Sequence, residues 1–433
     1  MRYFLDLFGC VKNQVDAENM MAFLNGAGWS AVEDAADADL IIVNSCGFIE
    51  SAKQESINAV LAWRKFHPGK KILLAGCLAQ RYAKELAESL TEADGFFGIS
   101  DISMIVEKAN SLFPVPNPQP PFSYSTRPLL SLPGSAYIKI SEGCDNRCTF
   151  CAIPLIRGPL RCRTVPDILE ECRGLLARGI RELCIIGQDI GLYRSGGSGL
   201  PELLNAIAEF SGNFWVRLLY MHPGHFPLPI LDIMERDTRF LPYFDIPFQH
   251  SSQRILLAMN RRGTAENYLA LAENIRERLP AAVIRTTFLL GFPGETSADF
   301  AALLDFQEKL RPDWLGCFSY SREDGTPAWS MKGQVPSKTA VLRKREIEER
   351  QISITEKSMD RFTGQTLDVL LEEQFSGEES AGESLWLGRL YCHAPEVDGA
   401  AVVTGEKPDC KAGSIVPCTV IARRGFDLKV RLK

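Results

Sequence analysis

Residues 137–151 read YIKISEGCDNRCTFC, and this stretch decides the fold of the centre of the chain. Tyr137–Ile140 is a short apolar run that predicts a strand, and a Glu-Gly turn follows it. Cys144, Cys148 and Cys151, the barrel triad, come next with C-x3-C-x2-C spacing. Active sites of βα barrels lie at the C-terminal ends of the strands. Cysteines just beyond such an end therefore indicate a reactive centre.

The barrel triad is suited to an iron–sulfur cluster. Thiolates are soft ligands that bind such clusters and zinc. Cluster sites often use four cysteines. Here three lie within eight residues, so one iron would lack a protein ligand and stay open to a substrate. A structural zinc site is the alternative, because zinc usually takes four closed ligands and Cys162 could supply the fourth.

Around this stretch, strands and helical segments alternate. Six units of this kind between about 135 and 335 predict a partial, TIM-like (βα)6 barrel, since a full eight-strand barrel needs a longer segment. The strands are expected at 136–141, 182–187, 215–220, 243–247, 283–290 and 314–319.

The N-terminal part has the same alternation on a smaller scale. Short apolar runs at 3–8, 40–43 and 72–75, separated by helical stretches and followed by another at 79–91, predict an open parallel α/β sheet. One cysteine follows each run, and the ends of parallel strands meet at one edge of a sheet, where ligands bind. We therefore expect a second cluster site, the N-terminal triad of Cys10, Cys46 and Cys77. The alternative is that small cysteines merely pack well near strand ends.

Composition changes mark the domain boundaries. Seven prolines crowd residues 114–133, which predicts a semi-rigid linker. After a charged helical stretch at 339–361, short strands broken by Gly and Pro predict a small all-β barrel. The predicted organisation is an N-terminal cluster domain at 1–115, a Pro-rich linker at 116–133, a βα-barrel domain at 134–362 and a small β-barrel domain at 363–433.

Charge and hydropathy exclude several classes of protein. The net charge of −6 lacks the basic surplus typical of proteins that bind bare nucleic acid. The N-terminus, MRYFLDLFGC, has no apolar core or cleavage site of a signal peptide, and no run of about 18 apolar residues suggests a membrane span. We therefore expect a cytoplasmic protein without membrane contact. There, thirteen cysteines favour metal ligation or catalysis over disulfides.

Several motifs carry a family resemblance. The barrel triad, with Phe150 before its last cysteine, resembles the radical S-adenosylmethionine superfamily. The whole chain resembles the methylthiotransferase family, whose parts are an N-terminal cluster domain, a radical barrel and a C-terminal TRAM domain. The supporting motifs are GCVKN at 9–13, IVNSCGFI at 42–49, AGC at 75–77, KISEGC at 139–144 and AIPLIRG at 152–158. Residues 46–49, 218–223, 245–250 and 320–327 look like the branch that modifies a ribosomal protein.

The resemblance implies two [4Fe–4S] clusters and S-adenosyl-L-methionine as cofactors. The barrel cluster would generate the radical, and the N-terminal cluster would carry the sulfur. The substrate would be an aspartate of small-subunit ribosomal protein S-twelve, free or in the small subunit, methylthiolated at its β-carbon. A monomer that draws on a separate electron donor is expected. Phe150, Gln188, Asp189 and Arg285 are the expected contacts to the cofactor, although loop capping for Gln188 and Asp189 and a structural salt bridge for Arg285 are alternatives.

Two other functions compete with this interpretation. One is methylthiolation of a tRNA adenosine, and the other is a non-catalytic iron–sulfur electron-transfer or binding protein. Residues 365–433 carry eight basic and eleven acidic side chains, hence 8 − 11 = −3, and phosphate binding would favour a basic domain. An acidic surface would instead attract a basic ribosomal protein. The acidic run at 372–379 is the expected contact, with a solvated loop as the alternative.

Overall fold

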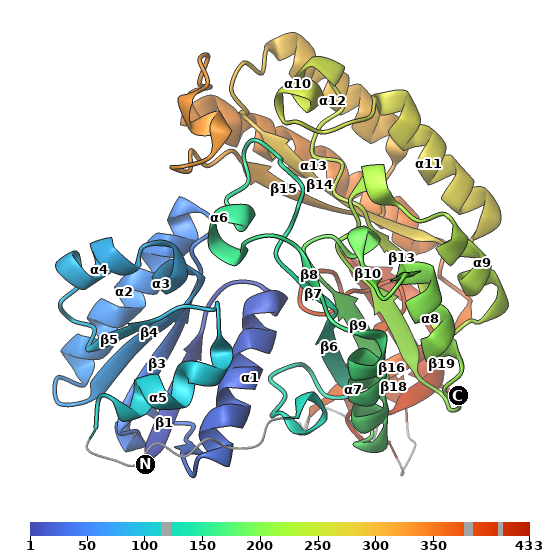
Figure 1. The fold of residues 1–433 in the computed structure, drawn as a ribbon. Helices are drawn as coiled ribbons and strands as arrows, with labels where there is room; N and C mark the ends of the chain where they lie inside the picture. Colours follow the sequence, from blue (N-terminus) through green and yellow to red (C-terminus); the bar gives the residue numbers. More distant parts are fainter. Residues whose placement is uncertain (114–122, 376–383, 406–409) are drawn as a thin grey trace. The chain divides into compact units, whose positions relative to one another are not determined.

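The computed structural model describes residues 1–113, 123–375, 384–405 and 410–433 (Figure 1). Its contacts divide the chain into two compact units. The first unit consists of Met1–Leu130, Ser141–Arg161 and Ser321–Trp329, and the second consists of Ser131–Ile140, Cys162–Tyr320 and Ser330–Lys433. The segment that carries the barrel triad therefore packs in the same unit as the N-terminal domain.

A five-stranded parallel sheet forms the centre of the first unit, in the order β2-β1-β3-β4-β5. This confirms the open parallel α/β sheet predicted from the apolar runs. The pairing is in direct register, with Tyr3 opposite Leu40 and Asn44 opposite Ala75. The strands are β1 (Arg2–Leu7), β2 (Ser30–Ala31), β3 (Leu40–Ser45), β4 (Lys71–Gly76) and β5 (Gly95–Phe97).

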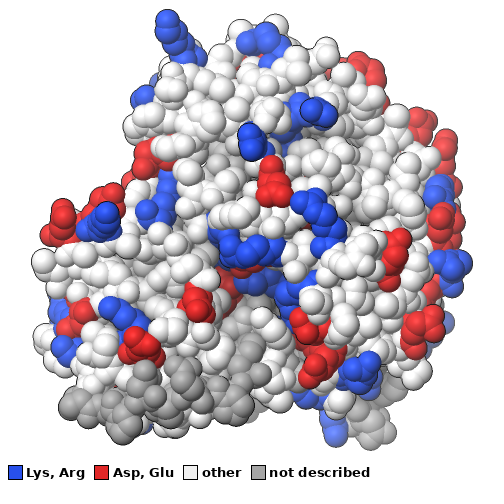
Figure 2. Space-filling model, viewed as in Figure 1, with Lys and Arg blue, Asp and Glu red and all other residues white. Residues whose placement is uncertain are grey.

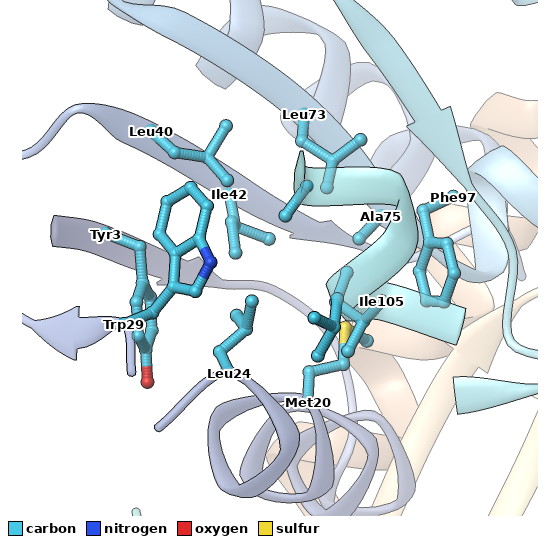
Figure 3. Close-up of a cluster of buried hydrophobic side chains, with 12 residues drawn as sticks. Tyr3, Met20, Leu24, Trp29, Leu40, Ile42, Leu73, Ala75, Phe97 and Ile105 are labelled. Carbon is cyan, nitrogen blue, oxygen red and sulfur yellow. The ribbon is translucent and has the colours of Figure 1, made fainter. Parts of the chain in front are cut away.

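Helices cover both faces of this sheet, because alternate strand residues point to opposite faces. Leu40 and Ile42 join a buried cluster with α1 (Val11–Gly26) and α5 (Ile105–Asn110) (Figure 3). Ile41 and Val43 pack on the other face, against α2 (Glu50–Phe66), α3 (Cys77–Arg81) and α4 (Ala83–Ser89). Fully burying one such side chain contributes roughly 1.5–3 kcal/mol, so the two layers fix the strand ends that carry the N-terminal triad.

The helical stretch expected at 79–91 is interrupted. Tyr82 separates α3 from α4 and has an extended φ of −126°. Its hydroxyl donates a hydrogen bond to Asp324, and Arg81 beside it pairs with Glu323. These long-range contacts, which a local pattern does not contain, accompany the break.

A six-stranded parallel sheet with the order β15-β14-β13-β12-β9-β6 forms the centre of the second unit. It confirms the partial barrel and its six strands, which are β6 (Ser135–Lys139), β9 (Glu182–Ile186), β12 (Trp215–Leu218), β13 (Phe240–Asp245), β14 (Val283–Leu290) and β15 (Trp314–Ser319). The helices of this unit are α7 (Val165–Ala177), α8 (Leu200–Ala208), α9 (Pro229–Arg236), α10 (Gln253–Ala258), α11 (Ala265–Arg278), α12 (Ser297–Leu310) and α13 (Ser337–Asp360). Short strands elsewhere are β7 (Ser141–Glu142), β8 (Arg161–Cys162), β10 (Arg194–Ser195) and β11 (Ser198–Gly199).

The C-terminal residues form the predicted small β-barrel, which is closed in the order β16-β17-β18-β20-β19. Its strands are β16 (Thr366–Phe375), β17 (Ser384–Leu390), β18 (Ala401–Gly405), β19 (Ile415–Arg424) and β20 (Asp427–Leu432). A buried ionic network joins this barrel to the six-stranded sheet. Glu182 of β9 accepts from Arg217 Nε at 2.7 Å and from Arg389 Nη2 at 2.6 Å, and Arg389 Nε also pairs with Glu372 at 2.5 Å.

Among the described helices, none has the length and apolar character needed to cross a bilayer.

Candidate functional site

The structure places the N-terminal triad at the ends of three neighbouring strands. Cys10 precedes α1, Cys46 directly follows β3, and Cys77 begins α3 directly after β4. Burial raises the pKa of the Cys77 thiol, and the charges of Cys10 and Cys46 raise it further. The packing at Gly9 is also close, because a Cβ there would lie 3.0 Å from Cys46 Cβ.

Asn13 holds the three strand ends together. Its Nδ2 donates to the carbonyl oxygens of Phe8 at 2.7 Å, Asn44 at 3.3 Å and Ser45 at 3.2 Å. In return, Asn44 Nδ2 donates to the Asn13 carbonyl at 2.8 Å, and Cys77 Sγ lies 3.8 Å from Asn13 Oδ1. Asn13 is 1% exposed. The side chain therefore bridges backbone carbonyl oxygens where the strands end, and it fixes the loops that carry the cysteines.

The chemistry of the N-terminal triad fits a metal cluster. All three cysteines are free, and Cys77 is buried, Cys46 half-buried and Cys10 exposed. Burial raises the pKa of the Cys77 thiol to about 12, although Arg157 opposes that effect. Metal binding replaces the thiol proton with a cation and so removes the cost of a buried thiolate. The donor set, three thiols on one sheet edge, is thus suited to a [4Fe–4S] cluster with one iron open.

The barrel triad lies in a loop that folds back on itself within the first unit. Cys144 N donates to Gly158 O at 3.1 Å, and Cys151 N donates to Cys148 O at 3.1 Å. Gly143 allows the loop to fold back, because its φ is +74°, a conformation that favours glycine. A Cβ at this position would also lie only 2.1 Å from the carbonyl oxygen of Pro159. All three cysteines are partly exposed. Three thiols open to solvent in one loop fit a cluster that binds a small cofactor at its fourth iron.

Phe150 lies inside this loop, between the second and third cysteines, and is half-buried. Its predicted contact to the cofactor stays a prediction.

A small apolar cluster packs the two triad regions together inside the first unit. Cys77 and Ile99 contact Ala152 and Ile156, with Phe48 against them. Ala152 directly follows the last cysteine of the barrel triad, and Ile156 belongs to α6 (Ile153–Arg157). The relation between the two triads is therefore set by packing within one compact body.

Arg157 extends this link with polar contacts. The residue is 4% exposed. Its Nη1 donates to Asp16 Oδ2 and to Glu142 Oε1, both at 2.9 Å, and its Nη2 donates to Cys77 Sγ at 3.1 Å. Sequence spacing assigned Arg157 no role of its own, and its place in the AIPLIRG motif was the only available signal.

The 321–329 segment completes the first unit. Glu323 is 2% exposed and accepts from Arg81 Nη1 at 2.7 Å and from Lys53 Nζ at 3.1 Å. Further along, Ala328 N donates to Thr149 O at 2.9 Å, in the loop of the barrel triad. The segment thus contacts both the N-terminal helices and the cysteine loop.

The predicted cofactor residues Gln188 and Asp189 follow β9 in the second unit. Gln188 Oε1 is buried and accepts no hydrogen bond from the described residues. A buried acceptor without a donor is unfavourable, so the position fits contact with a bound polar group. This supports the prediction for Gln188 without testing it.

Asp189 lies beside two histidines that follow β12. Its Oδ2 is 2.9 Å from His225 Nδ1, and its Oδ1 accepts from His222 N at 3.2 Å. One ligand-type atom from each of the three side chains lies within 4.8 Å of the others. Burial, together with the charge of Arg261, lowers the pKa of His222 to about 3, so this imidazole is neutral near pH 7.

Arg285 of β14 has carboxylate partners within the protein. Its Nη1 is 3.2 Å from Asp245 Oδ1, and its Nε is 3.5 Å from Asp398 Oδ1. The geometry matches the structural salt bridge that the sequence left open as the alternative. Contact with the cofactor carboxylate stays a prediction.

The acidic contact expected at 372–379 is wrong for Glu372. That side chain is only 6% exposed and pairs with Arg389, so it cannot meet a partner protein. Residues 376–379 lie outside the described residues. On the face drawn in Figure 2, acidic and basic side chains are interspersed.

Comparisons with known proteins agree with this geometry. The uncharacterized protein family UPF0004 matches residues 2–98, the Radical SAM superfamily matches residues 138–306 and the TRAM domain matches residues 363–432. A protein named ribosomal protein uS12 methylthiotransferase RimO from Treponema denticola is 48% identical, with 98% of this chain and 99% of the relative covered. This chain belongs to the RimO methylthiotransferase family.

Other RimO family members show the same end-to-end match. RimO of Carboxydothermus hydrogenoformans is 39% identical over 99% of both chains, and RimO of Thermotoga maritima is 39% identical over 94% of both. Among solved structures, the radical S-adenosylmethionine methyltransferase TsrM from Kitasatospora setae, with cobalamin and a [4Fe–4S] cluster bound, superimposes with a TM-score of 0.55. It is 15% identical and covers 76% of each chain, which shows a shared fold.

Proposed function

We propose that this RimO family member inserts a methylthio group at the β-carbon of an aspartate in ribosomal protein uS12, by radical chemistry. The observation that carries the proposal is the packing of both cysteine triads in one compact unit. An electron-transfer protein needs no second open cluster beside a radical site. A sulfur-inserting enzyme does, because the carbon radical and the sulfur must meet within bonding distance.

The proposal divides the work between the two triads. When bound, the barrel cluster would supply the electron that cleaves one S-adenosylmethionine, the N-terminal cluster would supply the sulfur, and a second S-adenosylmethionine would supply the methyl group. Cys144, Cys148 and Cys151 hold the first cluster, and the N-terminal triad holds the second. Gln188 and Asp189 orient the methionine part of the cofactor.

Surrounding residues hold both sites in place through side-chain and backbone hydrogen bonds. Asn13 fixes the loops of the N-terminal triad, and Ala328 and Gly158 fix the barrel loop through the backbone bonds described above. Held geometry of this kind lowers the entropic cost of bringing the reacting groups together.

Incubation with candidate substrates tests the proposal. The anaerobically reconstituted enzyme is given S-adenosylmethionine, a reductant and either small ribosomal subunits or bulk tRNA. Mass spectrometry of tryptic uS12 peptides and of digested tRNA then locates any gain of a methylthio group. We expect the gain on a uS12 aspartate. A gain on tRNA adenosine alone would contradict the uS12 target, and no gain on either, with cofactor still cleaved, would contradict methylthiotransfer.

Three finer features belong to the same proposal. The enzyme works as a monomer, in the cytoplasm, and receives electrons from a separate donor protein. Light scattering of the reconstituted protein checks the first feature, because a monomer gives the mass of one chain. Comparison of physiological reductant proteins as replacements for a chemical reductant checks the last.

A further inference from the structure

Arg157 occupies an unusual position between the two triads. It ends α6, six residues after Cys151, yet its guanidinium lies against Cys77 of the other triad. The side chain is almost completely buried, and a buried cation without partners is strongly unfavourable. Here Asp16, which is 0% exposed, and Glu142 balance its charge.

The two ends of the guanidinium serve different partners. Nη1 binds both carboxylates, which already satisfies the ionic requirement of a buried Arg. Nη2 is directed at a sulfur atom that is expected to ligate iron. A purely structural ion pair needs only the first set of contacts, so the second points to a role toward the cluster.

General properties of iron–sulfur centres indicate what that role is. Reduction adds negative charge to the cluster, and the potential depends on net charge and on hydrogen bonds to the sulfurs. A fixed cation that donates an N–H to a ligand sulfur stabilises the reduced form more than the oxidised form. Arg157 therefore favours reduction of the N-terminal cluster.

The same residue also links the two cluster loops. Glu142 lies two residues before Cys144, and Asp16 lies in α1, which begins directly after Cys10. Through these carboxylates, Arg157 connects the start of the barrel loop to the helix that follows the first cysteine of the N-terminal triad. A lysine could keep the charge but not the fork of donors that reaches three partners.

We propose that Arg157 is a positioning residue that raises the reduction potential of the N-terminal cluster and holds the barrel cluster loop beside it. The inference rests on the proposed function only in requiring a cluster at Cys10, Cys46 and Cys77. It does not depend on the identity of the substrate.

The experiment isolates one cluster in the full-length chain. Cys144, Cys148 and Cys151 are replaced together by Ala, so that only the N-terminal cluster remains after reconstitution. Its midpoint potential is then measured by redox titration monitored by electron paramagnetic resonance. The variants are Arg157→Gln, Arg157→Lys and Arg127→Gln in this background. Arg127 is the matched control, because it is fully buried in the first unit and pairs at 2.9 Å with Glu18, a carboxylate that is not a partner of Arg157.

We expect Arg157→Gln to lower the midpoint potential and Arg157→Lys to restore part of the difference. Arg127→Gln should leave the potential unchanged even where it lowers stability. Equal potentials for the parent, Arg157→Gln and Arg157→Lys would overturn the proposal. If Arg157→Gln fails to hold iron, the test rests on the midpoint potential of Arg157→Lys. A potential of Arg157→Lys identical to that of the parent would count against the proposal.

The failure of the proposed function would look different. A parent that assembles no cluster at the N-terminal triad would refute the two-cluster enzyme itself. A normal cluster whose midpoint potential does not change when Arg157 is replaced would refute only the role of Arg157. With both clusters present, pulsed measurements of their magnetic interaction test whether Arg157 holds the barrel cluster loop in position. Arg157→Lys should broaden the distribution of distances between the two clusters. An unchanged distribution would contradict this positioning role.

Discussion

At the residue scale, Asn13 shows how one side-chain amide can bridge several backbone carbonyl oxygens at the ends of strands. Its Nδ2 is shared among three carbonyl oxygens, and each would be left without that donor in an Asn13→Ala variant. Leaving a buried polar group unsatisfied costs about 1–3 kcal/mol. We expect Asn13→Ala to lose the N-terminal cluster, so that iron falls from about eight to about four per chain.

The matched control for that change is Asn25→Ala. Asn25 lies in the same helix and accepts one hydrogen bond, from the Tyr3 hydroxyl at 2.9 Å. It should retain the full iron content. Equal iron loss in both variants would mean that the effect is general destabilisation of α1 and not loss of the hydrogen bonds from Asn13 to the strand ends.

The six cysteines themselves make the second prediction at this scale. Replacing any member of the barrel triad by Ala should abolish formation of 5′-deoxyadenosine, because the cofactor then has no cluster to bind. Replacing Cys10, Cys46 or Cys77 by Ala should stop methylthio transfer and leave some 5′-deoxyadenosine. Cys172→Ala is a suitable control, since that thiol is buried within α7. Chromatography of the quenched reaction distinguishes the outcomes, and loss of 5′-deoxyadenosine in both sets would argue against separate roles.

At the scale of elements, the 321–329 segment depends on one buried carboxylate. Glu323→Gln removes the charge that pairs with Arg81 and Lys53, and removing one partner of a buried ion pair costs about 3–5 kcal/mol. We expect faster hydrogen exchange at the Ala328 amide, which bonds to the barrel loop. Glu346→Gln, an exposed pair with Arg350 on α13, should change little. Unchanged exchange at Ala328 in the Glu323 variant would show that the backbone alone holds the segment.

Sequence patterns predicted the elements better than the contacts between them. The strands β3, β4 and β14 were predictable because their runs are apolar and rich in Ile, Leu and Val. The placement of Cys10, Cys46 and Cys77 at neighbouring strand ends was predictable because parallel strands end on one edge. Asn13, Arg157 and His225 were not, since each acts through contacts to residues far away in the sequence. The break at Tyr82 was missed for the same reason.

At the scale of the whole molecule, Glu182 joins the small C-terminal barrel to the six-stranded sheet. Glu182→Gln would leave Arg217 without its buried anion and would leave Arg389 with Glu372 alone. We expect the apoprotein to lose about 3–5 kcal/mol of unfolding free energy at neutral pH. Glu235→Gln is the control, because that carboxylate is exposed and its surface ion pair with Arg278 contributes little to stability. Denaturant titration of both variants measures the difference.

The pKa of Glu182 determines how the stability difference between wild type and Glu182→Gln depends on pH. Burial opposes its ionisation, but Arg389 and Arg217 outweigh burial and lower the pKa from 4.5 to about 2. Between these values the unfolded chain binds more protons than the folded chain, so stability falls as the pH falls. The contribution is fully present above pH 4.5 and is lost as the pH drops through about 2. The difference in unfolding free energy between wild type and Glu182→Gln should therefore become smaller in acid. A difference that does not depend on pH would contradict the negative charge assigned to Glu182.

The division of the chain into two units has a practical consequence for protein engineering. Anyone who grafts the N-terminal part of one relative onto the remainder of another would naturally cut once, in the linker. Such a chimera would separate Met1–Leu130 from Ser141–Arg161 and Ser321–Trp329, the two inserts with which it packs. A viable hybrid should transplant all three pieces together, because they pack against one another in one compact unit.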